Sequence, residues 1–171
     1  MSDGWSPIPG IDDAVFVSVS VGFACVVHQS GNVSCWGGNS FYQLGRGTKD
    51  FGSPQNVHGL PAAVAIATGS RHACALTREK TVWCWGSNGE KQSGGEGPEH
   101  IRVPTRISGI DDVAALSLSG YTSCARRTNG ESWCWGEKER PTIAQSVSYG
   151  FRPVRVSADE VDAAWTGRQL P

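Results

Sequence analysis

The sequence has little of what long helices, membrane spans or nucleic-acid-binding surfaces require. Its 171 residues include one methionine but 22 glycines and nine prolines, a composition typical of short strands joined by tight turns. The net charge is −1, which excludes the strongly positive surface that displaces counterions from DNA. No apolar run approaches the ~18 residues of a membrane span. We expect a single repeat domain of residues 1–171 that binds neither nucleic acid nor membrane.

The start of the chain also lacks a secretory signal. Residues 1–5 include no basic region followed by an apolar one. Six evenly placed cysteines point the other way, because disulfides persist in oxidising compartments. We favour a secreted or periplasmic location and regard the sequence as an excised segment of an exported protein, with the cytosol as the alternative.

One tripeptide is repeated along the chain. Cys-Trp-Gly occurs three times, ending at Gly37, Gly86 and Gly136, and each of its cysteines has another cysteine ten positions upstream. Successive copies are 49 and 50 residues apart. A fixed period of about 50 residues indicates stacked supersecondary units, each of which buries its apolar face against a neighbour. The repeat predicts a propeller-like protein, a class that usually binds rather than catalyses.

Each copy contains four short strand signals. In the second copy, residues 54–57 read as an edge strand because proline cannot donate to a sheet ladder, and the small apolar residues 62–68 read as the innermost strand. Residues 72–77 and 81–86 then form a hairpin. Corresponding segments are 104–107, 113–118, 122–127 and 131–136 in the third copy, and 5–8, 14–19, 23–28 and 32–37 in the first. Four strands at this period predict an all-β chain of propeller blades.

After the third copy the pattern starts again and stops. Residues 153–156 match the edge strand and 161–165 the inner strand. We therefore expect three full four-stranded blades plus a partial fourth, in repeat units of approximately 5–53, 54–103, 104–152 and 153–171. Closed propellers have about four to eight blades. We expect the ring to be completed by a longer chain, by a partner, or by a second copy in a two-fold dimer.

The cysteine pairs flank the predicted hairpins, so that the two members of a pair face each other. Opposed residues on antiparallel strands have Cα atoms about 4.5–5.5 Å apart, within disulfide range. We favour three disulfides, Cys25–Cys35, Cys74–Cys84 and Cys124–Cys134. Two alternatives stay open: reduced cysteines acting as small buried hydrophobes, and a zinc site, which favours cysteines about two to four residues apart.

Three motifs around the cysteines carry a family resemblance. They are Gly-Ser-Arg-His-Ala-Cys-Ala-Leu at 69–76, Val-Trp-Cys-Trp-Gly-Ser-Asn at 82–88, and Trp-Gly-Gly-Asn at 36–39 continuing to Gln-Leu-Gly at 43–45. Together they resemble the repeat of the regulator of chromosome condensation family, in the cysteine-rich form common in bacterial members. Kelch repeats share the period but lack this signature.

The resemblance implies a propeller, usually of seven blades, that binds other proteins. Family members include an exchange factor for a nuclear GTPase, a plant ultraviolet photoreceptor and a secreted bacterial inhibitor of β-lactamase. This chain departs from the pattern at Lys91-Gln92-Ser93-Gly94, where Gln-Leu-Gly is expected, and at 137–150, which has no clear match. The position of His72 is Phe23 in the first copy and Thr122 in the third, so it is not a repeated chemical site.

Patterns of catalytic or metal-binding residues are absent from the sequence. The four histidines (His28, His58, His72 and His100) are scattered, without metal-ligand spacing. Asp12-Asp13 recurs as Asp111-Asp112 after Gly-Ile, which favours a structural turn. The glycine-rich segment 94–97 lacks the following lysine and helix of a phosphate-binding loop. We expect neither enzymatic activity nor a cofactor or metal ion.

The aromatic residues separate into two groups. Trp83 and Trp85 alternate with Cys84, as do Trp133 and Trp135 with Cys134, so they share a strand face and pack between blades. Five aromatics lie instead in or beside predicted turns and are candidate partner contacts, since such residues are enriched in interface hot spots: Phe41, Tyr42, Tyr121, Tyr149 and Phe151.

These observations predict a non-enzymatic protein-interaction module that presents variable loops from a disulfide-stapled partial propeller and self-associates. The alternative is a structural segment of a larger or self-assembled propeller with no ligand of its own. Guanine-nucleotide exchange and enzyme inhibition rest on the family analogy alone. The sequence does not identify the partner.

Overall fold

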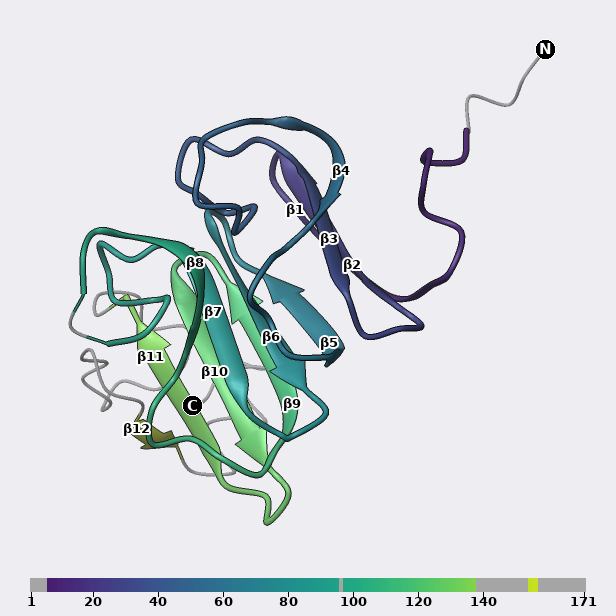
Figure 1. Ribbon diagram of the computed structural model, residues 1–171. Helices are drawn as coiled ribbons and strands as arrows, with labels where there is room; N and C mark the ends of the chain where they lie inside the picture. Colours follow the sequence, from purple (N-terminus) through teal and green to yellow (C-terminus); the bar gives the residue numbers. More distant parts are fainter. Residues whose placement is uncertain (1–5, 96, 138–153, 157–171) are drawn as a thin grey trace, which may run out of the picture.

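The described part of the chain is a row of three antiparallel sheets. The computed structural model describes residues 6–95, 97–137 and 154–156 (Figure 1). The strands are β1 (Ala14–Ser20), β2 (Phe23–His28), β3 (Val33–Gly37) and β4 (Gly52–Asn56); β5 (Ala63–Thr68), β6 (His72–Thr77), β7 (Val82–Ser87) and β8 (His100–Arg106); β9 (Val113–Ser119), β10 (Thr122–Arg127), β11 (Ser132–Gly136) and β12 (Val154–Val156). No described segment forms a helix long and apolar enough to cross a membrane. The all-β prediction is confirmed.

Within each sheet the four strands follow one another in chain order, β1-β2-β3-β4 in the first sheet and likewise in the others. The glycine of each Cys-Trp-Gly lies at the end of the third strand, or one residue before it, with φ of 102° at Gly37 and 105° at Gly86. A Cβ on Gly86 would lie 2.6 Å from the carbonyl oxygen of Arg71 in the preceding turn. The motif therefore requires glycine at this position, because the backbone of the turn before β6 passes too close for a side chain.

The edge strands pair differently from the sequence-based expectation. Residues 54–57 were expected to start the second unit, but β4 pairs with β3 and completes the first sheet. Likewise β8 completes the second sheet and β12 the third. Residues 6–8, expected to hold the first edge position, form no strand. The reason is that the chain leaves β3, turns in a long loop and returns antiparallel beside the same strand, where an edge position tolerates Pro54.

This pairing changes the interpretation of the chain's last residues. The segment 153–156 was expected to open a partial fourth blade, yet β12 lies beside β11 as the outer strand of the third sheet. The expected inner strand at 161–165 lies outside the described residues. The strands of the three sheets run from 14 to 56, from 63 to 106 and from 113 to 156. The repeat boundaries read from the sequence therefore fall within β4 and β8 and just before β12, so each fourth strand was assigned wholly or partly to the following unit.

The core lies between the sheets rather than within them. β5 packs against β1 and β2, and β9 packs in the same way against β5 and β6 (Figure 1). At the first junction, the fully buried Trp85 joins a cluster with Phe23 and Ile66. At the second junction, Trp135 is equally buried in a cluster with Val113. Each sheet buries apolar area mainly by stacking on its neighbour, which is how propeller blades are stabilised.

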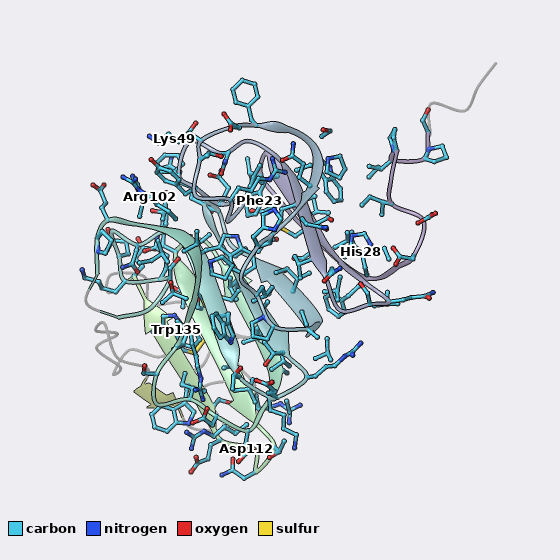
Figure 2. The ribbon with its side chains drawn as sticks, in the orientation of Figure 1. Phe23, His28, Lys49, Arg102, Asp112 and Trp135 are labelled. Atoms are coloured by element: carbon cyan, nitrogen blue, oxygen red, sulfur yellow. A yellow bond between two sulfur atoms is a disulfide. The ribbon has the colours of Figure 1, made fainter. Side chains whose placement is uncertain are left out.

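The same kind of hydrogen bond occurs at both junctions. The indole N–H of Trp85 donates to the main-chain carbonyl of Gln43 at 2.8 Å, and that of Trp135 donates to the carbonyl of Gln92 at 2.9 Å. Figure 2 shows Trp135 where the strands of the second and third sheets overlap. Trp85 and Trp135 therefore dock their sheets onto the loop of the preceding sheet.

Candidate interaction surface

The loops at one end of the strands form the candidate interaction surface. Three hairpin turns, at 21–22, 69–71 and 120–121, lie at this end together with the long loops 38–51 and 88–99. Main-chain hydrogen bonds connect neighbouring sheets here, from Ser70 N to the Gly120 carbonyl and from Gly47 N to the Arg102 carbonyl, each 2.9 Å. The loops of successive sheets are thereby fixed relative to one another, which is what a binding surface requires.

Asparagine and glutamine side chains shape the long loops. In the first loop, Asn39 Nδ2 donates to the carbonyls of Thr48 and Asp50 at 2.8 and 2.9 Å. The Gln43 side-chain oxygen accepts from the Phe41 amide at 2.9 Å. The second loop has the corresponding bonds: the Asn88 side chain donates to a main-chain carbonyl, and the Gln92 side chain accepts from a main-chain amide. Because both side chains are used to fold the loop, the residues between them are free to project outward.

A continuous row of aromatic and cationic side chains runs across these loops. We call it the cation–aromatic row; in spatial order its members are Tyr121, Arg71, Phe41, His100 and Tyr42, with Arg102 and Lys49 over the last ring. The guanidinium carbon of Arg71 lies 4.2 Å from the Phe41 ring centroid and 6.0 Å from that of Tyr121. Such distances are typical of cation–π contacts.

The row continues through His100 to a second group of cations. The Phe41 and Tyr42 rings lie 5.9 and 5.7 Å from the His100 ring. Arg102 and Lys49 lie 4.9 and 5.3 Å from the Tyr42 ring centroid. Figure 2 shows Lys49 and Arg102 close together at one end of the molecule, with Asp112 at the opposite end. All three sheets contribute to the row, which exists only when they are stacked.

A cavity of about 320 Å³ opens beside the row. Its walls are formed by residues of all three sheets: Val21, Ser40, Phe41, Gln43, Ser70, Arg71 and Tyr121. Val21 is 88% exposed, and Arg71 is also exposed, whereas the two aromatic rings are half-buried. The cavity combines apolar walls, hydroxyl groups and one cation, a mixture suited to a polar or anionic side chain of a partner.

A larger groove of about 860 Å³ follows β8 and ends at Trp133. The aligned space in the first sheet is occupied by Arg46, whose guanidinium donates to the Cys35 and Ser53 carbonyls. The second loop has Gly95 at the aligned position, with φ of 79°. The groove lies beside β8, and its polar lining residues include His100, Arg102 and Arg106.

Three of the five predicted contact residues lie in the candidate surface. Phe41, Tyr42 and Tyr121 are all members of the cation–aromatic row. Tyr149 and Phe151 lie outside the described residues. Sequence reasoning missed the cations and His100, since no spacing signal links Arg71, at a hairpin turn, to a histidine 29 positions later in β8.

A second polar cluster connects β2, β3 and β4 of the first sheet with Asp13, the residue before β1. His28 Nδ1 lies 2.5 Å from the Asp13 carboxylate, and its Nε2 lies 2.8 Å from the Ser34 hydroxyl. The order resembles a Ser-His-Asp triad, but Ser34 is buried and its hydroxyl donates to Asn56 Oδ1 at 2.9 Å. The hydrogen bond from His28 lowers the pKa of Asp13. The cluster acts as a brace across the sheet, because the hydroxyl proton is already bonded and the oxygen has no open approach.

His72 is a structural residue of the second junction. It is fully buried, and its Nε2 lies 2.8 Å from the Ser123 hydroxyl of the neighbouring sheet. Ser123 in turn donates to the Gln92 carbonyl at 2.8 Å. Burial lowers the pKa of His72 to about 3, so the ring is neutral at physiological pH. This location agrees with the absence of a repeated histidine site.

The six cysteines form three disulfides, Cys25–Cys35, Cys74–Cys84 and Cys124–Cys134, each with Cα atoms 4.1 Å apart. Members of each pair are directly opposite in the strand register. Elsewhere in residues 6–95, 97–137 and 154–156, no three His, Cys, Asp or Glu side chains gather as metal ligands.

The outward face of the first sheet is a second exposed surface. Val17 and Val19 on β1 are 60% and 71% exposed, and Trp36 on β3 is half-buried. The aligned residues of the second sheet, Ile66 and Trp85, are 2% and 0% exposed because the first sheet covers them. We call Val17, Val19 and Trp36 the free face; it matches a blade face whose preceding blade is not among the described residues.

Comparisons with known proteins show which repeat and which fold the chain resembles. Sequence models of the regulator of chromosome condensation (RCC1) repeat match residues 30–76 and 63–92. No curated protein sequence matches the chain.

Solved structures extend the likeness over most of the chain. The crystal structure of human WBSCR16 superposes with a TM-score of 0.79 at 18% identity, covering 88% of this chain and 39% of that one. Yeast RCC1 (Prp20), solved with bound Kap60, gives 0.75 at 16% identity, covering 86% and 38%. The chain thus spans well under half the length of these propellers, and at such identities the likeness concerns the fold.

Proposed function

Since this chain belongs to the regulator of chromosome condensation repeat family, we propose that it is a protein-interaction module. Its loop surface contacts a partner protein through the cation–aromatic row. The observation that carries this proposal is that three successive sheets place their loop aromatics and cations in one continuous surface. Tyrosine, phenylalanine and arginine are enriched at the centres of protein interfaces, where they bury much area at low entropic cost.

Related propellers support the same reading. Yeast RCC1 (Prp20) has been solved bound to Kap60, and Prp20p from Saccharomyces cerevisiae is described together with its binding to Gsp1p and histones. Those partners belong to those proteins. For this chain we take only the general role of protein binding, with no enzymatic step and no cofactor.

The test uses the full chain as bait in an extract of the source cells, with captured proteins identified by mass spectrometry. We expect Phe41→Ser and Tyr121→Ser to abolish capture of a specific partner, because each removes an aromatic of the row. Phe16→Ser is the matched control, since Phe16 is 45% exposed on β1 and distant from the row in the fold. Capture that survives both loop variants, or that is lost equally in the control, would contradict the proposal.

The second candidate function is structural, and the free face favours it. Exposed valines in a row on β1 are unusual for an independent surface and resemble the buried face of β5. On this view the chain is a segment of a larger propeller or self-assembles, most simply as a two-fold dimer. Sedimentation velocity at micromolar concentration distinguishes the cases: an associating chain gives more than the monomer mass of 18.2 kDa, and Val17→Asp with Val19→Asp restores the monomer. A wild-type chain that is monomeric at every concentration contradicts self-association.

A further inference from the structure

The three cations of the cation–aromatic row have no carboxylate partner in the described residues. The ion pairs in this part of the chain join His28 to Asp13, Arg106 to Asp111 and Arg127 to Glu131. Arg71, Arg102 and Lys49 belong to none of them, although all three are exposed. Their charges are therefore available to an incoming anion.

The carboxylates of the same loops form no ion pair with the row in the described residues. Asp50, Glu90 and Glu99 lie in the same loops and are exposed, but in the described structure none is ion-paired with Arg71, Arg102 or Lys49. The three cations of the row therefore keep their charges unpaired within the described residues.

The guanidinium of Arg71 is held in place before any partner binds. Its central carbon lies 4.2 Å from the Phe41 ring centroid, with that of Tyr121 6.0 Å away. The N–H groups of a guanidinium lie in its own plane, so a guanidinium held over a ring can still donate two parallel bonds to a carboxylate at its edge. Because the side chain is already ordered, binding an anion costs less conformational entropy than at a free arginine.

The cavity beside Arg71 has room for an acidic side chain together with part of the peptide that carries it, and its lining suits a carboxylate. Its volume of about 320 Å³ lies between Phe41 and Tyr121, with the hydroxyl-bearing Ser40 and Ser70 also in the wall. A carboxylate entering here would meet Arg71, and its methylene groups would pack on the two rings. Arg102 and Lys49, at the other end of the row, then offer a second anionic position.

From this geometry we infer that the partner segment is acidic: the loop surface binds an extended peptide with carboxylates spaced to reach Arg71 at one end and Arg102 with Lys49 at the other. The inference rests on the proposed function and adds the chemistry of the partner. Charge complementarity along a row of ordered cations gives specificity and association rate as well as affinity.

A single-stranded nucleic acid is the competing anion, since stacked aromatics with interleaved cations also bind bases and phosphates. The observations favour the peptide. Phe41 and Tyr42 are half-buried, Arg71 and Arg102 lie over their rings, and His100 meets both rings at an angle, so neither ring offers two open faces between which bases could stack. Three cations on a chain of net charge −1 also give little counterion release.

The experiment measures fluorescence anisotropy of the full chain with three labelled probes: a peptide of alternating glutamate and glycine, the same peptide with glutamine for glutamate, and oligouridine. We expect the glutamate peptide to bind, the glutamine peptide to bind at least about tenfold more weakly, and salt to weaken the glutamate complex. Arg71→Gln should weaken binding by about tenfold, and Arg71→Lys by less, because it keeps the charge and loses the paired donors.

Arg78→Gln is the matched control. Arg71 and Arg78 flank the two ends of β6 and both are exposed, so the charge change is the same while only one lies in the row. Denaturation curves that coincide with the wild type show that the variants are folded.

Three results would overturn the inference: equal affinity for the glutamate and glutamine peptides, equal loss with Arg78→Gln and Arg71→Gln, or tighter binding of oligouridine than of the acidic peptide. The last would assign the row to nucleic acid. The capture experiment tests the proposed function separately. A partner captured from extract that is lost with Phe41→Ser but retained with Arg71→Gln leaves the interaction module standing and removes only its acidic ligand.

Discussion

The first and second sheets present the same face to different surroundings. On the second sheet, Ile66 and Trp85 are buried against the first sheet at 2% and 0% exposure. On the first sheet, the aligned Val17 is 60% exposed and the aligned Trp36 is half-buried. The strands, register and disulfide are the same in both sheets. The difference shows that a neighbouring sheet, rather than the sheet itself, provides the burial.

This difference in burial corresponds to a difference in the free energy of folding. Burying a large apolar side chain contributes about 1.5–3 kcal/mol relative to leaving it exposed. The second sheet gains this at the junction, and the first sheet gains it only if something covers the free face. Variants at aligned positions therefore separate what the repeat contributes from what its neighbour contributes.

The largest expected effect is at the junction tryptophan. Trp85→Ala removes a fully buried indole and its bond to the Gln43 carbonyl, and should lower the free energy of unfolding by about 3–5 kcal/mol. Trp36→Ala should cost about 1 kcal/mol, since Trp36 is only half-buried. Urea denaturation at equilibrium measures both. Equal losses would mean that the free face is covered in solution.

The next effect concerns the disulfides, which should not differ between the two sheets. Each bridge spans a sequence separation of ten, so replacing both cysteines by alanine should cost at most about 2.5–3 kcal/mol in either sheet. We expect Cys25→Ala/Cys35→Ala and Cys74→Ala/Cys84→Ala to give similar losses in urea. Thiol titration of the unfolded wild type should find no free cysteine; free thiols, or bridges between different sheets, would contradict the pairing.

A smaller effect depends on pH and belongs to the second sheet. His72 has a pKa of about 3 when folded and 6.5 when unfolded, because burial disfavours the charged ring. Below its unfolded pKa, only the unfolded state gains the proton. Stability is therefore full above about pH 6.5 and falls as pH decreases, by about 2 kcal/mol from pH 7 to pH 5.

The first sheet supplies the control for this titration. Phe23 occupies the position aligned with His72, so His72→Phe substitutes the first repeat's residue and should remove that part of the pH dependence. Unfolding in urea at several pH values tests it. A variant with the slope of the wild type would show that another group titrates in this range.

The smallest expected effect is on the free face itself. Val19→Ser at a position 71% exposed should change the stability of the monomer by less than about 0.5 kcal/mol. Ile66→Ser at the buried face should cost several times more, because it leaves an unsatisfied hydroxyl in the core. Thermal unfolding at low protein concentration compares them. A large loss at Val19 would indicate that a second copy covers it.

Much of the fold could be predicted from the sequence because it follows from local patterns. The Cys-Trp-Gly period gave the repeat, and alternation around Cys84 placed Trp85 at a junction. The assignment of β4 could not be predicted in the same way. The residue types of 52–56 do not show whether this segment pairs with the hairpin before it or with the hairpin after it. Only the return of the chain through loop 38–51 decides which sheet the segment joins.

The candidate surface was predictable only in part. An aromatic beside a turn, such as Phe41 or Tyr121, has less core to fill, so its residue type is a signal by itself. The residue types of Arg71 and His100 carry no such signal, because these side chains join the cation–aromatic row only when the sheets are stacked. Tyr42 adds a backbone reason: its φ of 61° is rare for a bulky residue and depends on the loop's own hydrogen bonds.

The acceptor of each junction tryptophan is a main-chain carbonyl, and this has a consequence for how such chains can change. Every residue, proline and glycine included, offers the same main-chain carbonyl, so the docking bond of Trp85 does not depend on which side chain stands at its acceptor. A loop can therefore exchange most of its sequence, as 88–99 differs from 38–51, while the next repeat still attaches at the same point. Repeats built this way are interchangeable parts: grafting the loop of one onto another should alter what the surface recognises and leave the attachment of its neighbour intact.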